Sequence, residues 1–314
     1  ITNEGYVYEI TPEGVKYIGH QGEDTPPDLQ ETDIEFTMNP STPTRGSVKV
    51  GINTKISGYT LQYSTNEGKT WSNYTGEVTV TDNGPIYARL INNLDETGGY
   101  ATGNVENIDR LAPNTFTPSV TSTTNTITLT GSTTDAARTE TDGSSGIKAY
   151  YFSRDNGSTW EPANGQAETS YTFNNLTQNT KYQLKMKAVD EAGNETETNT
   201  ISKTTGTVPG LTQNDTTFSY SPSTPTSGNV LVTITTTVGA GYTLQYSTDE
   251  TKTWNNYTTA VTMTNNGVIY ARLIDSKGQA GEYTTGNVTN IDRTPPTVTI
   301  STSDITAASA KLNV

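Results

Sequence analysis

The sequence predicts an all-β chain built from tandem β-sandwiches. Residues 242–296 repeat residues 59–113 at a constant offset of 183, and 36 of these 55 positions are identical. The chain of 314 residues is 30% hydrophobic and contains 18 Tyr and 28 Gly, a composition typical of short strands with polar outer faces. Short alternating segments are separated by turn residues, and the sequence lacks a helical period.

The repeat divides the chain into modules in the order A, B, A and the start of a second B. Complete modules in a tandem array bury their own cores, so we expect these sandwiches to be arranged end to end. We predict these segments: 1–32, an N-terminal β-hairpin and linker; 33–112, repeat A1; 113–208, module B; 209–295, repeat A2; 296–314, the truncated start of a second B module.

The N-terminal segment has the pattern of a β-hairpin. Residues 6–10 and 15–18 alternate as strands, and residues 11–14 have the composition of a turn. A lone two-stranded hairpin is marginally stable in water. We therefore expect it to pack on A1 or to end a domain that lies upstream.

Repeat A1 has the strand pattern of a sandwich. Tyr59, Leu61 and Tyr63 alternate along one strand and should face the core. Asp82-Asn83-Gly84 has the composition of a tight hairpin turn. The predicted strands are 34–38, 48–52, 59–63, 78–80, 86–91 and 103–108.

Module B has its own strands, and one of them alternates clearly. Within 181–188, Tyr182, Leu184, Met186 and Ala188 should face inward while Lys and Gln side chains face outward. The other predicted strands are 126–130, 147–152, 171–173 and one near Thr200.

Module B resembles a fibronectin type III domain over roughly 95 residues. Leu176, Thr180 and Tyr182 stand at the L-x-P-x-T-x-Y spacing of that family, with Gln178 where the family has Pro. Residues 190–194, D-E-A-G-N, are similar to a hairpin of bacterial members. The resemblance implies a fold rather than a function.

The A repeats resemble bacterial Ig-like repeats. Tyr63-Ser64, Thr70-Trp71, the Y-T-G at residues 74–76 and the D-R-T-P-P junction at residues 292–296 carry this resemblance. It implies an extracellular location on a bacterial surface, as in surface-anchored proteins, adhesins and accessory regions of secreted enzymes.

Charge and composition exclude several classes of function. A net charge of −14 opposes binding to nucleic acid or to an anionic membrane, and the sequence has no apolar run that could span a bilayer. The absence of Cys excludes thiol and disulfide chemistry, and a single His leaves no zinc site. We predict no catalytic residue, no cofactor and no metal ligand.

Residues 153–160 match S-x-D-x-G-x-T-W, which is similar to the Asp box of sialidase propellers. Trp71, Trp160 and Trp254 are 89 and 94 residues apart, whereas propeller blades recur about every 40 to 50 residues. We interpret the box as a turn in which the acidic side chain folds back on the backbone and the Trp clamps the turn. The same box carries Asn66 in A1, and Thr251 replaces its Gly in A2.

Three further features have alternative interpretations. The three Trp side chains could stack on sugars instead of packing on the turn. Asp109, Asp190 and Asp292 could bind calcium where modules meet, or they are solvated turn acids. The acidic, Gly-rich loop 133–146 is either a recognition loop or a mobile one.

The sequence favours a non-catalytic spacer, the shaft or stalk of a bacterial cell-surface or secreted protein. The alternative is a glycan-binding array or the accessory modules of a secreted carbohydrate-active enzyme. Expected partners are host or cell-surface glycans or proteins, without nucleic acid and without membrane insertion. Residues 297–300 and 310–314 should form two strands that can self-associate. We expect the Gly-containing connection 206–215 to be mobile.

Overall fold

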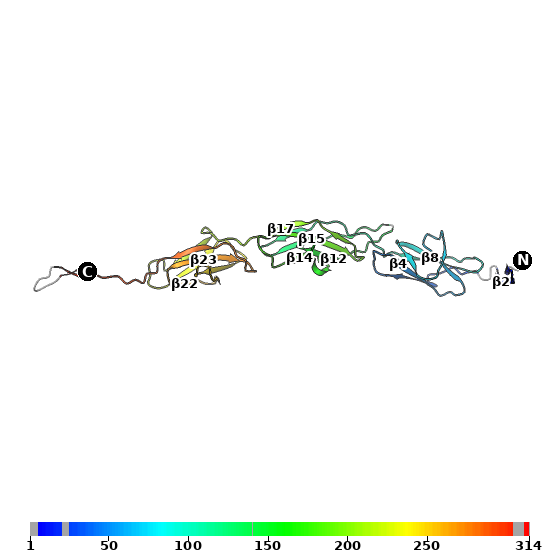
Figure 1. Cartoon of the computed structure of the whole chain (residues 1–314), viewed down its shortest axis with the longest axis horizontal. Helices are drawn as coiled ribbons and strands as arrows, with labels where there is room; N and C mark the ends of the chain where they lie inside the picture. The colour runs from blue at the N-terminus through cyan, green and yellow to red at the C-terminus, as the bar shows by residue number, and fades with distance from the viewer. Residues whose placement is uncertain (1–5, 21–24, 140, 304–310, 314) are drawn as a thin grey trace. The chain divides into compact units, whose positions relative to one another are not determined.

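The computed structural model describes residues 6–20, 25–139, 141–303 and 311–313. Its regular elements are β-strands in antiparallel sheets (Figure 1). The chain divides into two compact units. Unit 1 comprises residues 1–121, 128–172 and 182–203, and unit 2 comprises residues 122–127, 173–181 and 204–314. Unit 1 therefore contains A1 and most of B, and unit 2 contains A2 with the end of B that it contacts.

A1 is a sandwich of two sheets, drawn in blue to cyan in Figure 1. Tyr59, Leu61 and Tyr63 pack against its core, as predicted. One sheet has the order β3 (Ile34–Asn39), β4 (Val48–Thr54), β7 (Val78–Val80), and the other β6 (Ser72–Asn73), β5 (Thr60–Ser64), β8 (Gly84–Ile91), β9 (Ala101–Val105). The core side chains come from both sheets: Val48, Val50, Ile52, Val78, Ile86, Ala88, Leu90 and Val105 among them.

The hairpin turn predicted at residues 82–84 is wrong. The strands on either side of it, β7 and β8, belong to different sheets, so this segment crosses from one layer to the other. Asn83 is 8% exposed, and its side chain bonds to the backbone of Ile108. Turn composition alone did not distinguish a hairpin from a crossing stabilised by a buried amide.

Module B, drawn mainly in green in Figure 1, is a sandwich with the predicted alternation in its longest strand. Leu184, Met186 and Ala188 are completely buried, and Tyr182 is half-buried. One sheet has the order β10 (Ser119–Ser122), β11 (Ile127–Thr130), β14 (Ser170–Phe173). The other has the order β13 (Glu161–Gln166), β12 (Ile147–Ser153), β15 (Lys181–Asp190), β16 (Glu195–Glu197), and β17 (Ile201–Thr204) also pairs with β15.

A2 repeats the architecture of A1, as their sequence identity predicts. Tyr246 pairs with Ala271 as Tyr63 pairs with Ala88. One sheet has the order β18 (Thr216–Ser221), β19 (Val230–Thr236), β22 (Val261–Met263), and the other β21 (Asn255–Asn256), β20 (Thr243–Ser247), β23 (Gly267–Ile274), β24 (Thr284–Val288). The sheets confirm the predicted fold class, an all-β chain of Ig-like and fibronectin type III-like sandwiches.

The connection 206–215, which we expected to be mobile, makes tertiary contacts. Val208 and Leu211 are 4% and 3% exposed and belong to the core of A2. The Gly206 amide donates to the Thr123 carbonyl at 2.8 Å, and the Leu211 amide donates to the Glu282 carbonyl at 2.9 Å.

The N-terminal hairpin forms as predicted from β1 (Tyr6–Thr11) and β2 (Gly14–His20). Tyr8 and Tyr17 make an edge-to-face contact at 5.5 Å between ring centroids. Ile10 and Val15 are 84% and 66% exposed, so the expected packing of this face on A1 is not found.

Near the other end of the chain, β25 (Ser301–Ser303) pairs with β26 (Lys311–Asn313). The first strand begins after the predicted range 297–300, and Val298 and Ile300 are 61% and 58% exposed. The predicted ends Ala310 and Val314 lie outside the described residues.

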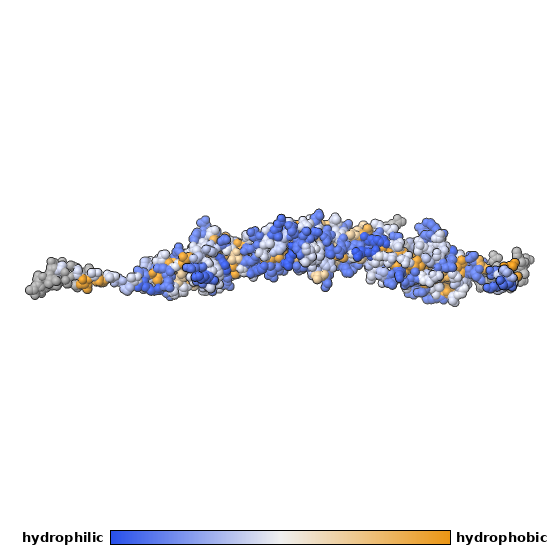
Figure 2. Space-filling model, in the orientation of Figure 1, coloured by the Kyte–Doolittle hydropathy of each residue, from blue (hydrophilic) through white to orange (hydrophobic). Residues whose placement is uncertain are grey.

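The visible surface is mostly hydrophilic. Figure 2 shows blue and white over most of this face, with orange residues scattered between them. Among the residues that the structure describes, no helix has the length and apolarity of a membrane span.

Gly103 allows a close contact between the two sheets of A1. A Cβ at this position would lie 2.6 Å from the ring of Phe36. We expect Gly103→Ala to lower the free energy of unfolding of A1 by about 1–3 kcal/mol because the ring must move.

The control is Gly76→Ala, where an added Cβ meets nothing within 4 Å. Local stability from amide exchange in β3 and β9 measures the difference. Equal exchange in the two variants would contradict this role of Gly103.

Candidate functional site

The candidate site lies in unit 1, where the end of A1 meets two loops of B. We call Thr44, Asn83, Ile108, Asp109 and Arg110 the A1 pole. Thr44 and Ile108 form a parallel bridge, and the Asp109 amide donates to the Thr44 carbonyl at 2.8 Å. The Asn83 side chain donates to the Ile108 carbonyl at 2.7 Å and accepts from the Ile108 amide at 2.9 Å. These bonds hold the pole in one conformation.

The loop 133–146 of B docks on the A1 pole through its backbone. The Gly143 amide donates to the Ile108 carbonyl at 2.7 Å, and the Asn83 amide donates to the Thr141 carbonyl at 3.1 Å. Neither interpretation of this loop, outward recognition or free mobility, fits these bonds. Its described residues recognise the neighbouring module instead.

Asp109 and Arg110 of the A1 pole complete the contact with B. Asp109 Oδ2 accepts from the Ser145 amide at 2.9 Å, and the Asp109 carbonyl accepts from Asn194 Nδ2 at 3.0 Å. Arg110 pairs with Asp142 at 3.0 Å. The hydrogen bonds at the centre are therefore bordered by an ion pair.

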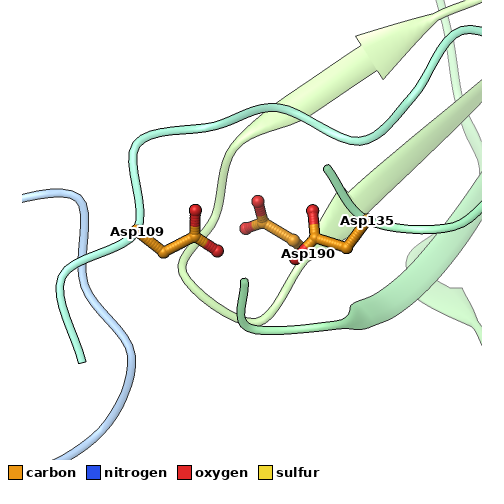
Figure 3. Close-up of side chains that lie close together, drawn as sticks. All are labelled: Asp109, Asp135 and Asp190. Carbon is orange, nitrogen blue, oxygen red and sulfur yellow. The ribbon is translucent and has the colours of Figure 1, made fainter. Parts of the chain in front are cut away.

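Three carboxylates gather beside this contact. Asp109, Asp135 and Asp190 point toward one another in Figure 3, and one oxygen from each lies within 4.8 Å of the others. Asp109 and Asp190 are 1% and 0% exposed. The interpretation as solvated turn acids is therefore wrong for these two residues, and Asp135 was not predicted. The third predicted acid, Asp292, lies in A2 and is exposed.

Donors from the chain surround these carboxylates. Asp190 accepts from the amide and the side chain of Asn194 at 2.7 and 2.8 Å, and Asp135 accepts from the Gly146 amide at 2.8 Å. A carboxylate oxygen keeps a lone pair beside each such bond, so these three residues, all in the described part of the chain, could together hold a hard cation such as Ca²⁺. The donors also compensate the buried charge without a cation.

Burial raises the pKa of the Asp190 carboxyl, and the nearby Asp109 and Asp135 raise it further, against a lowering by hydrogen bonds from Asn194. A raised folded-state pKa means that the folded protein holds the proton more tightly than the unfolded chain does. The contribution of Asp190 to stability therefore falls as the pH rises above the usual range of an Asp.

A second contact between modules lies in unit 2, where the end of B meets A2. Asp275 is 5% exposed and accepts from the Thr124 hydroxyl at 3.0 Å. Gln279 Nε2 donates to the Leu176 carbonyl at 3.0 Å, and Lys277 Nζ donates to the Asn175 carbonyl at 2.6 Å. This contact also consists of directed polar bonds.

Gln178, the departure from the fibronectin type III spacing, is part of this second contact. Its amide donates to Gln279 Oε1 at 2.5 Å, and its side chain donates to the Ala280 carbonyl at 2.9 Å. Its Oε1 accepts from the Val208 amide at 2.7 Å. A Pro at this position has no amide hydrogen to donate, so the departure serves the attachment of A2.

The three Asp-box segments form the predicted turns. In B, Asp155 Oδ1 accepts from Ser153 Oγ and from the Thr159 amide, both at 2.8 Å. In A2, Asp249 accepts from the Thr253 amide at 3.0 Å and from its hydroxyl at 2.5 Å. In A1, Asn66 accepts from the Thr70 amide at 3.0 Å. Hydrogen bonds from Thr253 lower the pKa of Asp249 to about 2.

Each Trp lies under a cation on the outer face of its sheet. Arg89 Cζ is 4.2 Å from the ring centroid of Trp71, and Arg272 Cζ is 4.1 Å from that of Trp254. Lys187 Nζ is 5.1 Å from that of Trp160. One face of each half-buried indole is covered in this way, which favours packing over sugar stacking at the Trp itself.

Several residues of these contacts were missed by sequence reasoning. Asn83 was assigned to a turn, and Asp135, Thr124 and Gln279 received no role. A signal was present for Asn83, because Asn266 occupies the same place in A2. That signal was weak, since 36 of the 55 compared positions are identical in the two repeats.

Comparisons with known proteins add little detail. No family model matches the chain, and no curated protein sequence matches it. Among solved structures, a crystal structure of the chicken CNTN1 FN1-FN3 domains is similar, with 13% sequence identity and a TM-score of 0.26. The alignment covers 84% of this chain and 98% of that one.

The Asp-box turn of A2 should respond to acid. The folded-state pKa of Asp249 is depressed from 3.8 to about 2, so its stabilisation is present above pH 3.8 and is lost as the pH falls toward 2. We expect Asp249→Asn to keep most of the turn and to remove this dependence, because Asn66 makes the same turn in A1.

Amide exchange of residues 247–254 between about pH 2 and 6, corrected for intrinsic rates, measures the effect. Asp249→Ala should loosen the turn at every pH because it removes the acceptor. The same pH dependence in wild type and in Asp249→Asn would refute the assignment.

Proposed function

We propose that this chain is a non-catalytic spacer, part of the shaft or stalk of a bacterial cell-surface or secreted protein. The observation that carries this proposal is the directed attachment of B at both of its ends. The Asn83 amide, Asp109 and Asn194 make one attachment, and Thr124, Gln178 and Gln279 make the other. A spacer must transmit orientation between its modules, and such contacts do so.

The stabilisation from these hydrogen bonds supports a stiff attachment between A1 and B. A hydrogen bond typically stabilises by about 0.5–1.5 kcal/mol, so the four bonds between the A1 pole and B together contribute several kcal/mol. The connection between them is short, since Asp109 and Pro113 are four residues apart. Bending at this position would break buried bonds and expose Asp109.

Composition supports an extracellular location. The net charge of −14 keeps such a surface soluble and self-repelling, and a chain without Cys forms no disulfide in an oxidising environment. The bacterial surface follows from the resemblance of the A repeats to bacterial Ig-like repeats. The partners that we propose are host or cell-surface glycans or proteins, bound by a domain that the shaft presents.

Spin labels on the two modules test the stiffness. The chain has no Cys, so Glu35→Cys on β3 and Lys148→Cys on β12 can be labelled selectively. Pulsed electron-spin distance measurements should give one narrow distance distribution in the labelled chain. Asn83→Ala combined with Asp109→Ala should broaden it, because the Asp109 side chain bonds to Ser145 of B and the Asn83 side chain fixes the Ile108 backbone on which B docks.

The matched control is Asn266→Ala, which removes the equivalent side chain from A2 and should leave the distribution narrow. A broad distribution in the labelled chain, equal to that of the double variant, would overturn the spacer proposal.

A second candidate function rests on one exposed aromatic residue in each A repeat. Tyr100 and Tyr283 are 58% and 50% exposed. Each packs edge-on against another Tyr, at 5.2 Å from Tyr87 and 5.4 Å from Tyr270. An exposed ring on a sheet face can stack on a sugar, so this observation favours glycan-binding or accessory modules of a carbohydrate-active enzyme.

Glycan-array binding separates the two functions. If the tyrosines bind glycans, the chain should bind specific glycans, and Tyr100→Ala with Tyr283→Ala should weaken binding at least tenfold. The control is Tyr17→Ala, which removes an exposed Tyr from the hairpin. Absence of binding by the wild-type chain would reject the glycan function.

A further inference from the structure

The two A repeats differ at one end and agree at the other. At one end, the loop after β8 of A1 reads N-N-L-D-E at residues 92–96, whereas the equivalent loop after β23 of A2 reads D-S-K-G-Q at residues 275–279. At the opposite end, residues 107–110 and 290–293 both read N-I-D-R. Thr226 and Asn266 likewise repeat Thr44 and Asn83.

The end that differs has different neighbours in the two repeats. In A2, Asp275 and Gln279 bond to B. In A1, the equivalent Asn92 donates from Nδ2 to Glu96 Oε2 at 2.8 Å, and its Oδ1 accepts from the Glu96 amide at 2.9 Å. The sequence at that end therefore differs where the neighbouring module differs. An end whose sequence is the same in both repeats indicates the same kind of neighbour.

The end that agrees also has the same geometry. We call Thr226, Asn266, Ile291, Asp292 and Arg293 the A2 pole. Asn266 donates to the Ile291 carbonyl and accepts from the Ile291 amide, both at 2.9 Å. The Asp292 amide donates to the Thr226 carbonyl at 2.8 Å. These bonds reproduce those of the A1 pole.

The two poles differ in burial. Asn83 and Asp109 are 8% and 1% exposed beneath the loops of B, whereas Asn266 and Asp292 are exposed. The groups that bind B in A1 are the Asn83 amide, the Ile108 carbonyl, and the side chain and carbonyl of Asp109. Their equivalents in A2 have the same arrangement on an exposed surface.

We propose that the A2 pole is a docking site for a second B-type sandwich, joined directly after residue 296. The exit of the chain supports an occupant in the same polypeptide. The Thr294 amide donates to Asp292 Oδ1 at 2.9 Å, as the Leu111 amide donates to Asp109 Oδ1 at 3.1 Å. Pro296 follows Asp292 at the spacing at which Pro113 follows Asp109.

The pole defines what the docked sandwich presents. The docked sandwich supplies a carbonyl to the Asn266 amide, one amide to the Ile291 carbonyl and another amide to Asp292 Oδ2. Residues 141–145 of B supply the same groups to A1. A side-chain amide like that of Asn194 completes the set.

The rim of the docked sandwich can differ from that of B. Arg45 and Glu106 of A1 are Ser227 and Thr289 in A2. The pair of Glu106 with Arg138, at 3.8 Å, is exposed, and such pairs contribute little. The central bonds therefore determine the kind of partner.

The test is amide exchange in the whole chain and in an extended chain, in which a second copy of residues 114–208 replaces residues 297–314. Docking should slow exchange of the Asn266 amide at least tenfold in the extended chain, toward the rate of the Asn83 amide in the same molecule. Asp292→Ala in the extended chain should restore faster exchange, and Lys252→Ala, an exposed residue in the Asp-box turn, should not.

Folding of the added sandwich is checked by protection of the amides that correspond to Leu184 and Met186. Equal exchange of the Asn266 amide in both chains, with those core amides protected, would overturn the proposal. Protection in the original chain that grows with protein concentration would assign the A2 pole to a second copy and would also overturn it. Neither result depends on the A1–B distances, so this proposal and the spacer function can fail separately.

Discussion

The structure depends on hydrogen bonds to the backbone amide and carbonyl of Ile108, where A1 ends. Beyond β9 the strand ladder stops, and an amide and a carbonyl buried at such a place need partners. The Asn83 side chain carries the same donor and acceptor pair as a peptide group, so it bonds to both. The carbonyl keeps a second lone pair, which accepts from the Gly143 amide. A single side chain thus closes one sandwich and prepares the surface on which the next one docks.

The fold followed from local patterns because sandwich strands bury alternate residues. Leu184, Met186 and Ala188 could be assigned to the core from their spacing, and the repeat arithmetic predicted that A2 would copy A1. Predictions failed where the decisive partner was distant in sequence. The segment around Asn83 looked like a turn because its partner, Ile108, lies 25 residues away. The connection 206–215 looked free because its contacts come from Thr123 and Glu282.

The candidate site could be predicted only in part for the same reason. Asp109 and Asp190 were recognised as acids near module ends, and the structure brings them together. Asp135 could not be added, because a loop acid has no pattern that distinguishes burial from solvation. Gln178 was visible as a departure from a family spacing, but its purpose required the position of Gln279. The role of a residue that joins two modules depends on its partner in the neighbouring module, and a single sequence does not identify that partner.

The two ends of B bind A repeats through unrelated sets of residues, loop 141–145 and Asn194 at one end and Thr124 and Gln178 at the other. Deleting B alone would bring two A ends together, and neither offers the groups that the other requires. Recombination that preserves every contact must therefore add or remove an A and a B together. Length variants that keep these contacts should therefore differ by one A–B pair, the 183 residues that separate Tyr59 from Tyr242.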